Sequence, residues 1–474
     1  MRICIIAEGC YPYVVGGVSG WIHNLVKSFP EHEFIILGII ANRTQRGQFQ
    51  YELPDNVINV YEAYLDDYDW STTRKEGKRT SLKKKEYRAL RSLVINNYVD
   101  WDTIFEMFQK KRFYIDDLLM GKDFLKIVRE IYDKKYSRLV FSDFLWTMRS
   151  IYLPLFLMLK TRIPKADIYH CVSTGYAGII GTMAKQQYGG KLILSEHGIY
   201  TREREEEIIK ANWVKGVYKS IWIDQFKKMS KVTYDRANRV TSLYEHAREL
   251  QIELGCEPKK TVVIPNGINI GRFADIPGKR ENDENYFNIG AVLRVAPIKD
   301  VKTLIQAFAF AKEREDKLKL WILGPTDEDE EYANECFDLV DSLEVKDVIF
   351  TGKIDVASYM GRLDVTILTS ISEGQPLTIL EGFAAKIPAI ATDVGNCREL
   401  IYGNDDDLGA AGIITHVMNV EEITEAILRL YRDPELRKEM GQTGYERVKR
   451  KYSIDTMRRA YDDLYESVAQ EEEE

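Results

Sequence analysis

Short apolar runs alternate with longer amphipathic segments along most of the chain. Ile3 to Ala7 and Phe34 to Ile40 are apolar runs, and the segment between them, Gly20 to Phe29, places apolar residues on one helical stripe. The runs predict buried strands and the intervening segment predicts a helix. Because a strand, a helix and a second strand in this order form a βαβ unit, the pattern predicts an α/β fold with parallel sheets.

The strand–helix alternation forms two series, separated by a polar stretch from Pro277 to Asn285. Later strands of the first series are predicted at Ala166–Val172, Lys191–Ser195, Asn238–Leu243 and Lys260–Ile264. Strands of the second series are predicted at Phe287–Leu293, Leu318–Leu323, Val348–Thr351, Val365–Thr369 and Ala389–Thr392. Between about residues 61 and 160 a mainly helical pattern, rich in aromatic and basic residues, interrupts the first series.

Two series of this kind predict two doubly wound, Rossmann-like domains. We expect the first domain over residues 1–280, with residues 61–160 as an insertion, and the second domain over residues 281–452. Residues 453–474 are expected to form a helix that returns to the first domain. The length of 474 residues supports this division, because it exceeds the size of one average core.

Composition narrows the class of protein. Hydrophobic residues make up 45% of the chain and charged residues 30%, as in globular proteins, and the net charge of -8 argues against a nucleic-acid binder. The six cysteines are scattered without a C-x-x-C pair, so we expect neither a disulfide framework nor a metal site. The longest apolar run, Ile151 to Leu159, is too short to span a membrane, and Gly9 interrupts the first strand too early for a signal peptide. These features predict a cytoplasmic protein.

The stretch from Ser372 to Glu381 follows the predicted strand Val365–Thr369 and carries the clearest chemical signal. Glu373 lies in the loop, Pro376 suits the first turn of a helix, and apolar residues then recur at helical spacing. A helix N-terminus binds anions through its free backbone amides and its dipole. Because carboxylates accept hydrogen bonds from hydroxyl groups, the stretch predicts a site for a phosphorylated sugar.

Other candidate residues follow the strands of the first series. Gly16 and Gly17 come after the first strand, where glycine permits either close approach of a ligand or an ordinary tight turn. His197 follows the strand Lys191–Ser195, at the edge where ligands bind in open α/β sheets. A buried structural histidine is the alternative for His197, and His170 has the same two interpretations.

A basic segment from Arg74 to Arg91, with Lys83 to Lys85 at its centre, lies in the predicted insertion. A solvated helix face or a loop is the first interpretation of such a segment. A docking surface for an acidic partner, or for the anionic inner leaflet of a membrane, is the alternative.

Several of these features together resemble a known family. They are Gly16-Gly17, Pro265 to Ile268, Arg294 and Lys299 after the first strand of the second series, and Glu373-x₇-Glu381. The constellation is similar to that of the family-four retaining glycosyltransferases, whose GT-B architecture has two Rossmann-like domains facing across a cleft. The segments Glu8–Pro12, Gly16–Trp21 and Glu196–Arg204 further resemble the PelF-type enzymes of Pel exopolysaccharide biosynthesis.

The resemblance implies roles for individual residues. The implied catalytic residues are His197, Arg294, Lys299 and Glu373. The implied donor-binding residues are Gly17, Gly324, Gln375, Pro376, Leu377, Thr378 and Glu381. The implied acceptor-side residues are Gly16, Tyr11, His170 and Arg202. Arg294 and Lys299 would neutralise the charge on a leaving diphosphate, as cations do in phosphoryl-transfer sites.

The implied activity is transfer of a hexose or an N-acetylhexosamine from a UDP-sugar to a growing exopolysaccharide or an oligosaccharide, with retention by a front-face mechanism. No metal or other cofactor is expected. The implied partners are the nucleotide sugar, the saccharide acceptor and candidate polysaccharide synthase subunits at the inner face of the membrane. Two alternatives stay open: a UDP-sugar epimerase of the same fold, and a non-catalytic nucleotide-sugar-binding subunit of a polysaccharide synthase complex.

Overall fold

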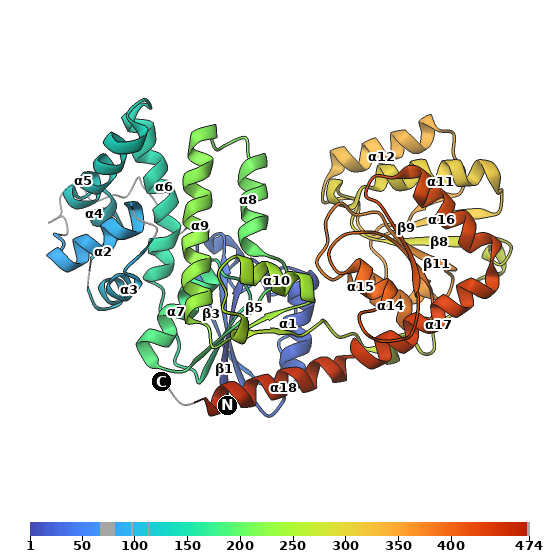
Figure 1. Ribbon diagram of the computed structural model, residues 1–474, viewed down its shortest axis with the longest axis horizontal. Coiled ribbons are helices and arrows are strands. Elements are labelled where there is room, and N and C mark those ends of the chain that lie inside the picture. The colour runs from blue at the N-terminus through green and yellow to red at the C-terminus, as the bar shows by residue number, and fades with distance from the viewer. Residues whose placement is uncertain (67–80, 96–97, 112, 472–474) are drawn as a thin grey trace. The chain divides into compact units, whose positions relative to one another are not determined.

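The structure is a computed structural model that describes residues 1–66, 81–95, 98–111 and 113–471 (Figure 1). The chain divides into two compact units: unit 1 comprises Met1–Val263 with Leu464–Glu474, and unit 2 comprises Ile264–Asp463. Each unit contains one parallel sheet with helices packed on it (Figure 1). The predicted α/β class with two doubly wound domains is therefore confirmed.

The seven-stranded sheet of unit 1 has the order β3-β2-β1-β4-β5-β6-β7, and every neighbouring pair is parallel. Its strands are β1 (Arg2–Glu8), β2 (Glu33–Ile40), β3 (Val57–Tyr64), β4 (Ile168–Cys171), β5 (Lys191–Ser195), β6 (Arg239–Ser242) and β7 (Thr261–Val263). The apolar runs of β1, β2 and β4 are buried on both faces. The chain order reverses between β1 and β4, and ligands bind at the carboxyl ends of such strands.

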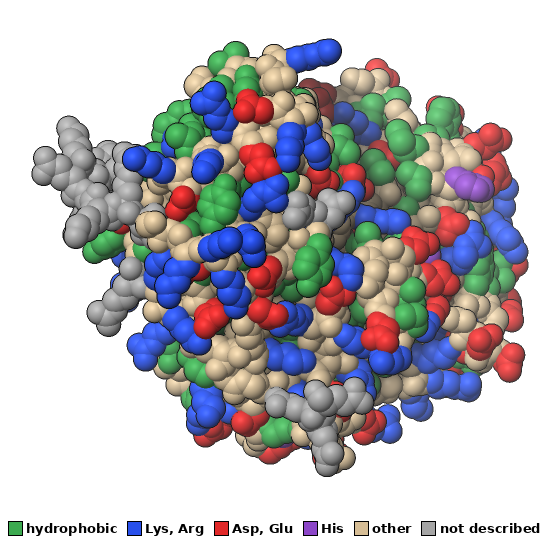
Figure 2. All heavy atoms as spheres, turned by 60° about the vertical axis from the view of Figure 1, so that its left-hand side comes forward, with side chains coloured by type: hydrophobic (Ala, Val, Ile, Leu, Met, Phe, Trp, Pro, Cys, Tyr) green, Lys and Arg blue, Asp and Glu red, His purple; other side chains and the backbone are tan. Residues whose placement is uncertain are grey.

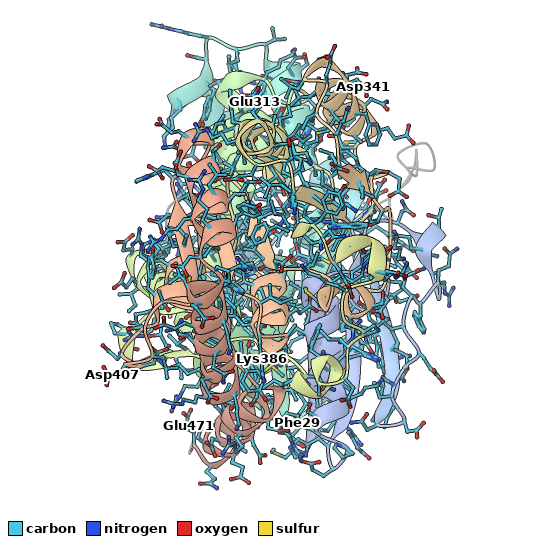
Figure 3. All side chains as sticks on the ribbon, turned by 90° about the vertical axis from the view of Figure 1, so that its right-hand side faces the viewer. Phe29, Glu313, Asp341, Lys386, Asp407 and Glu471 are labelled. Carbon is cyan, nitrogen blue, oxygen red and sulfur yellow. The ribbon has the colours of Figure 1, made fainter. Side chains whose placement is uncertain are left out.

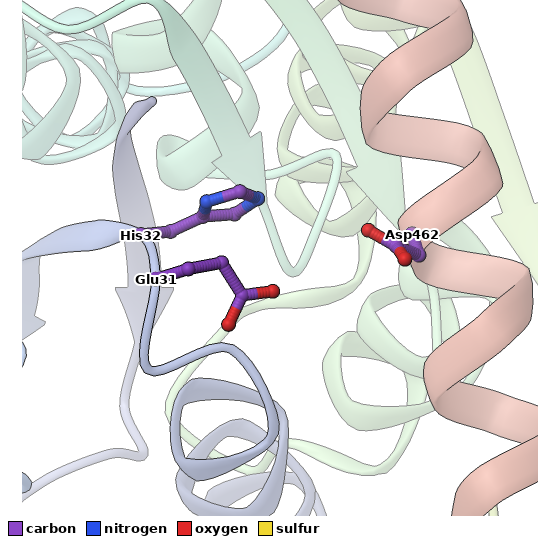
Figure 4. A group of neighbouring side chains, drawn as sticks. All are labelled: Glu31, His32 and Asp462. Atoms are coloured by element: carbon purple, nitrogen blue, oxygen red, sulfur yellow. The ribbon is translucent and has the colours of Figure 1, made fainter.

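The helices that pack on this sheet are α1 (Gly17–Ser28), α7 (Tyr176–Tyr188), α8 (Tyr200–Lys210), α9 (Gly216–Arg236) and α10 (Glu245–Glu253). Helix α1 buries Trp21, Leu25 and their neighbours on one stripe, as the helical spacing predicts. The turn from α1 to β2 contains Glu31 and His32 (Figure 4). The imidazole of His32 stacks on Phe29 with ring centroids 5.7 Å apart, so this turn is held by aromatic packing.

The insertion between β3 and β4 is helical, as predicted. Its helices are α2 (Lys84–Ile95), α3 (Trp101–Lys110), α4 (Ile115–Leu119), α5 (Lys122–Ile131) and α6 (Phe141–Leu159). Their apolar faces belong to the same hydrophobic core as the sheet of unit 1. The apolar run Ile151–Leu159 lies in α6 and packs into that core. Among the described residues, no helix is long and apolar enough to cross a membrane.

Part of the basic segment lies in this insertion. Arg74 falls within residues 67–80, outside the described residues, whereas Lys85 lies in the first turn of α2. Lys85 and Lys110 both face the carboxylate of Glu106, at 3.9 and 3.0 Å. Figure 2, which brings this side of the molecule forward, shows basic and acidic side chains interspersed. The described part of the segment therefore has the mixed charge of a solvated helix face.

The six-stranded sheet of unit 2 has the order β10-β9-β8-β11-β12-β13 and is also parallel throughout. Its strands are β8 (Phe287–Val292), β9 (Leu318–Leu323), β10 (Val348–Phe350), β11 (Val365–Leu368), β12 (Ala389–Thr392) and β13 (Gly412–Thr415). Its helices are α11 (Val301–Arg314), α12 (Glu330–Ser342), α13 (Ala357–Met360), α14 (Leu377–Ala384), α15 (Cys397–Tyr402), α16 (Val420–Arg432) and α17 (Pro434–Lys451). The chain order reverses between β8 and β11.

The segment that follows β7 belongs to unit 2. Ile268 forms a β-bridge with Ser453 and, together with Phe273, is buried in the core of unit 2. The compact units therefore divide after Val263, whereas the sequence pattern placed the linker at the more polar residues 277–285. The last helix, α18 (Ile454–Gln470), begins within unit 2, and its residues from Leu464 onward belong to unit 1.

Candidate active site

In unit 2, the carboxyl ends of β8 and β11 lie side by side, because these two strands pair directly. The loop after β8 carries Lys299, and the loop after β11 carries Glu373. The ammonium of Lys299 lies 2.5 Å from a carboxylate oxygen of Glu373, and the two side chains are only 18% and 11% exposed. The sheet order thus brings together two of the predicted catalytic residues.

Short hydrogen bonds hold these two loops in register. The backbone amide of Ile371 donates to the carbonyl of Ile298 at 2.9 Å, and the hydroxyl of Thr369 donates to the carbonyl of Lys299 at 3.1 Å. The hydroxyl of Ser370 donates to Glu373 Oε1 at 2.5 Å. Glu373 therefore has a fixed orientation with a cation and a hydroxyl on the same oxygen. Neither Ser370 nor Thr369 was a predicted site residue, although Thr369 ends the predicted strand Val365–Thr369 and Ser370 follows it.

The N-terminus of α14 follows Glu373 after a short loop. Pro376 occupies the N-cap position with φ -72° and ψ 109°, so the helix begins at Leu377, one residue later than predicted. No side chain of the described residues caps this end, which leaves the first backbone amides of α14 for an anion. Leu377 and Thr378 form this first turn and are partly exposed.

The side chain of Gln375 points into unit 2. It is 7% exposed, and its Oε1 accepts a hydrogen bond from the backbone amide of Asn266 at 2.7 Å. Gln375 thereby fixes the loop that contains Pro265 to Ile268. This hydrogen bond gives the side chain a structural role, while its Nε2 is buried without a hydrogen-bond partner among the described residues.

Gly395 permits the close packing of the loop around Glu373. Its φ is +51°, and an added Cβ atom would lie 2.2 Å from the carbonyl oxygen of Glu373. The next residue, Asn396, donates its backbone amide to the carbonyl of Gly374 at 2.9 Å. Gly395 lies in a Gly-Asn turn signal after β12, which could have identified it as a conformationally required glycine.

Arg294 is not part of the Lys299–Glu373 ion pair and forms a separate one. Its guanidinium forms a 2.5 Å ion pair with Glu328, and the two side chains are 56% and 44% exposed. Gly324, predicted to bind the donor, has φ +154°, and an added Cβ atom would lie 1.9 Å from the carbonyl oxygen of Leu293. Glycine at position 324 is therefore required for the close approach of the segments that follow β8 and β9.

Glu381 lies on α14, and its side chain is partly buried. Burial raises the pKa of its carboxyl to about 7, while the nearby Arg272 opposes this shift and Asp355 adds to it. Arg272 and Asp355 themselves form an ion pair at 2.5 Å. Glu381 is therefore a carboxyl group that titrates near neutral pH, unlike an ordinary exposed helix glutamate.

Unit 1 has a cavity of about 490 Å³ at the carboxyl edge of its own sheet. Glu8 at the end of β1, Ser173 after β4, and His197 after β5 line it, together with Glu203 and Arg204 of α8. The same topological rule that places the pair in unit 2 therefore places a cavity in unit 1.

The cavity of unit 1 contains two carboxylates in unusual surroundings. Glu8 accepts hydrogen bonds from Ser173 Oγ at 2.9 Å, from the backbone amide of Ala177 at 3.1 Å and from Tyr200 Oη at 3.2 Å. Burial raises the pKa of Glu8 and also that of Glu203.

Glu203 lies against the backbone at position 198. A Cβ atom added to Gly198 would lie 1.9 Å from Glu203 Oε1, so this glycine makes room for the carboxylate. Neither Glu203 nor Glu8 was a predicted site residue, although Glu8 directly follows the predicted strand Ile3–Ala7.

His197 packs edge-on against Trp21 with ring centroids 4.3 Å apart. Burial lowers the pKa of His197 to about 4, so the imidazole is neutral at physiological pH. Its Nε2 is buried and has no hydrogen-bond partner among the described residues. A buried polar atom of this kind requires a partner, and the cavity that His197 lines can supply one through a ligand.

His170 lies in the core of unit 1, where no acceptor can reach it. His170 is 0% exposed, and its two ring nitrogens contact Tyr465 Oη at 2.8 Å and Ser195 Oγ at 2.7 Å. Because both nitrogens already have partners inside the fold, the alternative of a structural histidine holds for His170.

Two further residues expected on the acceptor side also have other surroundings. Tyr11 is 0% exposed and packs on Tyr51, with ring centroids 5.2 Å apart. Arg202 is exposed and faces Glu253 at 3.9 Å. Gly16 and Gly17 begin α1, and no described atom lies within 4 Å of a Cβ atom added to either. The packing of unit 1 therefore does not require glycine at these two positions.

Two protein families match successive parts of this chain. Residues 1–259, more than half of the chain, match the family described as "Domain of unknown function (DUF3492)". Residues 273–447 match "Glycosyl transferases group 1". The chain belongs to the family that matches residues 1–259, and its residues 273–447 are those of a group 1 glycosyltransferase with GT-B architecture.

Individual relatives support the assignment. EpsD of Bacillus subtilis, named as a glycosyltransferase, is 27% identical over 59% of this chain and 71% of its own length. The UDP-Gal:alpha-D-GlcNAc-diphosphoundecaprenol alpha-1,3-galactosyltransferase of Escherichia coli is 27% identical over 60% of this chain and 71% of its length. Anabaena HepE in complex with UDP aligns over 98% of this chain and 100% of its own, with a TM-score of 0.64 and 14% identity. The last similarity concerns the fold alone and confirms the GT-B architecture.

Proposed function

We propose that this protein transfers a hexose or an N-acetylhexosamine from a UDP-sugar to a saccharide acceptor, with retention of configuration and without a metal ion. The Lys299–Glu373 pair beside the uncapped amino end of α14 carries the proposal. It combines a cation, a carboxylate and free backbone amides at the edge of the sheet where nucleotides bind.

Each group has a distinct task in this reaction. The ammonium of Lys299 and the first amides of α14 bind the diphosphate, and they stabilise the negative charge that grows on it as the glycosidic bond breaks. Glu373, held by Ser370, accepts hydrogen bonds from the sugar hydroxyls. Glu381 accepts hydrogen bonds from the ribose hydroxyls. Arg294 reaches the diphosphate by exchanging its exposed partner Glu328 for phosphate oxygens.

The cavity of unit 1 suits the acceptor. Its carboxylates Glu8 and Glu203 and the unpartnered nitrogen of His197 are groups that bind hydroxyls, and a saccharide presents many hydroxyls. In a front-face reaction the leaving phosphate itself takes the proton of the attacking hydroxyl, so the proposal assigns no protein base to that step.

Relatives favour uridine as the donor base. Structures of HepE hold UDP and UDP-glucose, and the Escherichia coli relative is named for UDP-Gal. The PelF-type resemblance of Glu8–Pro12, Gly16–Trp21 and Glu196–Arg204 favours an exopolysaccharide or oligosaccharide acceptor, with synthase subunits at the membrane as partners.

Thermal unfolding with a panel of nucleotides and nucleotide sugars tests the donor. At a hundredfold its Kd, a ligand adds about 2.7 kcal/mol to the stability of the state that binds it. We expect UDP and one UDP-sugar to stabilise the protein and adenosine nucleotides to leave it unchanged. Stabilisation by no uridine nucleotide contradicts the proposal.

Product analysis then separates the alternatives. Transfer to an added oligosaccharide supports the proposal, isomerisation of the UDP-sugar without acceptor identifies an epimerase, and binding without turnover identifies a non-catalytic subunit.

A further inference from the structure

A second cavity of unit 1 lies at the amino ends of β5, β6 and β7, at the opposite edge of the sheet from Glu8 and His197. Its volume is about 960 Å³. Six cationic side chains line this basic cavity, namely Lys185, Lys191, Arg236, Arg239, Lys259 and Lys260. Three carboxylates, of Asp235, Glu257 and Glu471, also line it, so the excess is three positive charges in a chain whose net charge is -8.

Three of the lysines contact only neutral oxygens. Lys185 Nζ donates to the carbonyl of Arg236 at 2.9 Å and to Asn238 Oδ1 at 2.7 Å. Lys260 Nζ donates to the carbonyl of Asp235 at 2.7 Å, and Lys191 Nζ donates to the carbonyl of Glu471.

Among the ion pairs of the described chain, none includes Lys185, Lys191 or Lys260. Burial, with the charges of Lys260 and Lys191 nearby, lowers the pKa of Lys185 to about 8. The wall formed by these three ammonium groups therefore gains electrostatically from an added anion.

The chain itself shows that the basic cavity accepts an anionic group. Glu471, which follows α18 (Figure 3), forms an ion pair with Arg239 and accepts a hydrogen bond from Asn238 Nδ2 at 2.9 Å. Among the residues that the structure describes, this carboxylate fills little of the cavity and leaves Lys185, Lys191 and Lys260 without an anionic partner.

We propose that the basic cavity binds a small anion with two or more phosphate groups, and that Glu471 competes with it for Arg239. The volume lies within the usual range for small-molecule sites, about 300–1,000 Å³. Lysine binds phosphate as a point charge and arginine binds it as a planar fork, and four lysines and two arginines line this cavity. This site is independent of the proposed transfer reaction, because the Lys299–Glu373 pair belongs to unit 2.

Calorimetric titration of the full-length protein with inorganic tripolyphosphate tests the proposal. A Lys299→Ala background weakens phosphate binding at the proposed donor site and is used for all the variants. We expect the double substitution Lys185→Gln, Lys260→Gln to weaken tripolyphosphate binding at least tenfold. Glu471→Gln is expected to tighten it severalfold, because the internal competitor loses its charge. A gain of affinity cannot result from misfolding.

The matched control is Lys83→Gln, Lys110→Gln, which removes two exposed lysines from the surface formed by α2 and α3. It should leave the titration unchanged. Equal affinity in all the variants, or no binding at all, overturns the proposal.

The source of the anion is resolved by two further probes. Orthophosphate should bind more weakly than tripolyphosphate, because it reaches fewer of the ammonium groups. Co-sedimentation with phosphatidylglycerol vesicles that depends on Lys185 and Lys260 identifies a lipid headgroup as the source. Tripolyphosphate binding without such co-sedimentation identifies a soluble anion.

Discussion

The two sheets share one strand order around their switch points, yet their carboxyl edges differ in chemistry. In unit 2 this edge presents Lys299, Arg294 and the amides of α14, with Glu373 held by the lysine. In unit 1 the same edge presents Glu8 and Glu203, both with raised pKa values. The fold therefore sets where a ligand binds, and the loop residues decide which chemical group it presents.

This difference matches two kinds of ligand. A positively charged edge binds phosphates, and a cation contacts the carboxylate at this edge. An edge with enclosed carboxyl groups and a neutral imidazole binds hydroxyls, because such groups exchange hydrogen bonds at little electrostatic cost. The contrast predicts that substitutions in unit 2 impair use of the donor and that substitutions in unit 1 impair use of the acceptor.

The largest expected effect comes from Lys299→Ala. Removing the cation from the diphosphate site should lower kcat by about a hundred- to a thousandfold, as the loss of one preorganised electrostatic contact does in other enzymes. The measurement is the initial rate of transfer from the UDP-sugar. Lys302→Ala is the matched control, because Lys302 forms an exposed ion pair with Glu335 on the same unit. An equal rate loss in both variants would show that the site lies elsewhere.

Sequence patterns predicted the strands, and the family resemblance placed Lys299 and Glu373 in one site, although their direct contact was not predicted. Apolar runs specify strands buried on both faces, and loops at neighbouring carboxyl ends must meet. Glu373 and Lys299 are 74 residues apart, yet each is placed by its own strand.

Contacts that depend on packing between distant segments could not be predicted in this way. His170 meets Tyr465 across 295 residues, and Arg294 meets Glu328 from the next loop. His170 lies inside the predicted strand Ala166–Val172 and His197 follows a predicted strand, but neither pattern shows which partners the two imidazoles meet. Gly324 was predicted to bind the donor, and its close approach to the backbone of Leu293 could not be predicted from the local pattern.

A second expected effect separates His170 from His197 within unit 1. Burial lowers the pKa of His170 from 6.5 to about 3, so the unfolded chain binds a proton there more readily than the folded one. The neutral imidazole of His170 contributes fully to the free energy of unfolding above pH 6.5. Below that pH the free energy of unfolding decreases, by about 2 kcal/mol between pH 7 and pH 5.

Hydrogen exchange of the β4 and β5 amides at the two pH values measures this change. His170→Gln should reduce the pH dependence by that amount, and the exposed control His246→Gln should not. Unchanged pH dependence in His170→Gln would mean that His170 is not held neutral in the core.

The third effect tests the acceptor cavity. Glu203→Gln should raise KM for the acceptor at least tenfold and leave KM for the donor unchanged, because a hydrogen bond to a charged group contributes about 1.5–3 kcal/mol. Initial rates with each substrate varied in turn give both constants. Glu206→Gln is the control, since Glu206 lies on the same helix in an exposed pair with Lys210. A larger change in the KM for the donor than in the KM for the acceptor would contradict the assignment of acceptor binding to unit 1 and donor binding to unit 2.

The smallest effect concerns Glu381, the carboxyl group of unit 2 whose pKa is raised to about 7. If ribose hydroxyls donate to this carboxylate, UDP binding favours its ionised form, so affinity should increase with pH. Since the ionised fraction rises from about one tenth at pH 6 to nine tenths at pH 8, the gain should be about five- to tenfold. The phosphate of UDP titrates in the same range, but this contribution is common to the wild type and Glu381→Gln. Calorimetry on both proteins therefore isolates the carboxyl group, and parallel pH profiles would place the ribose away from Glu381.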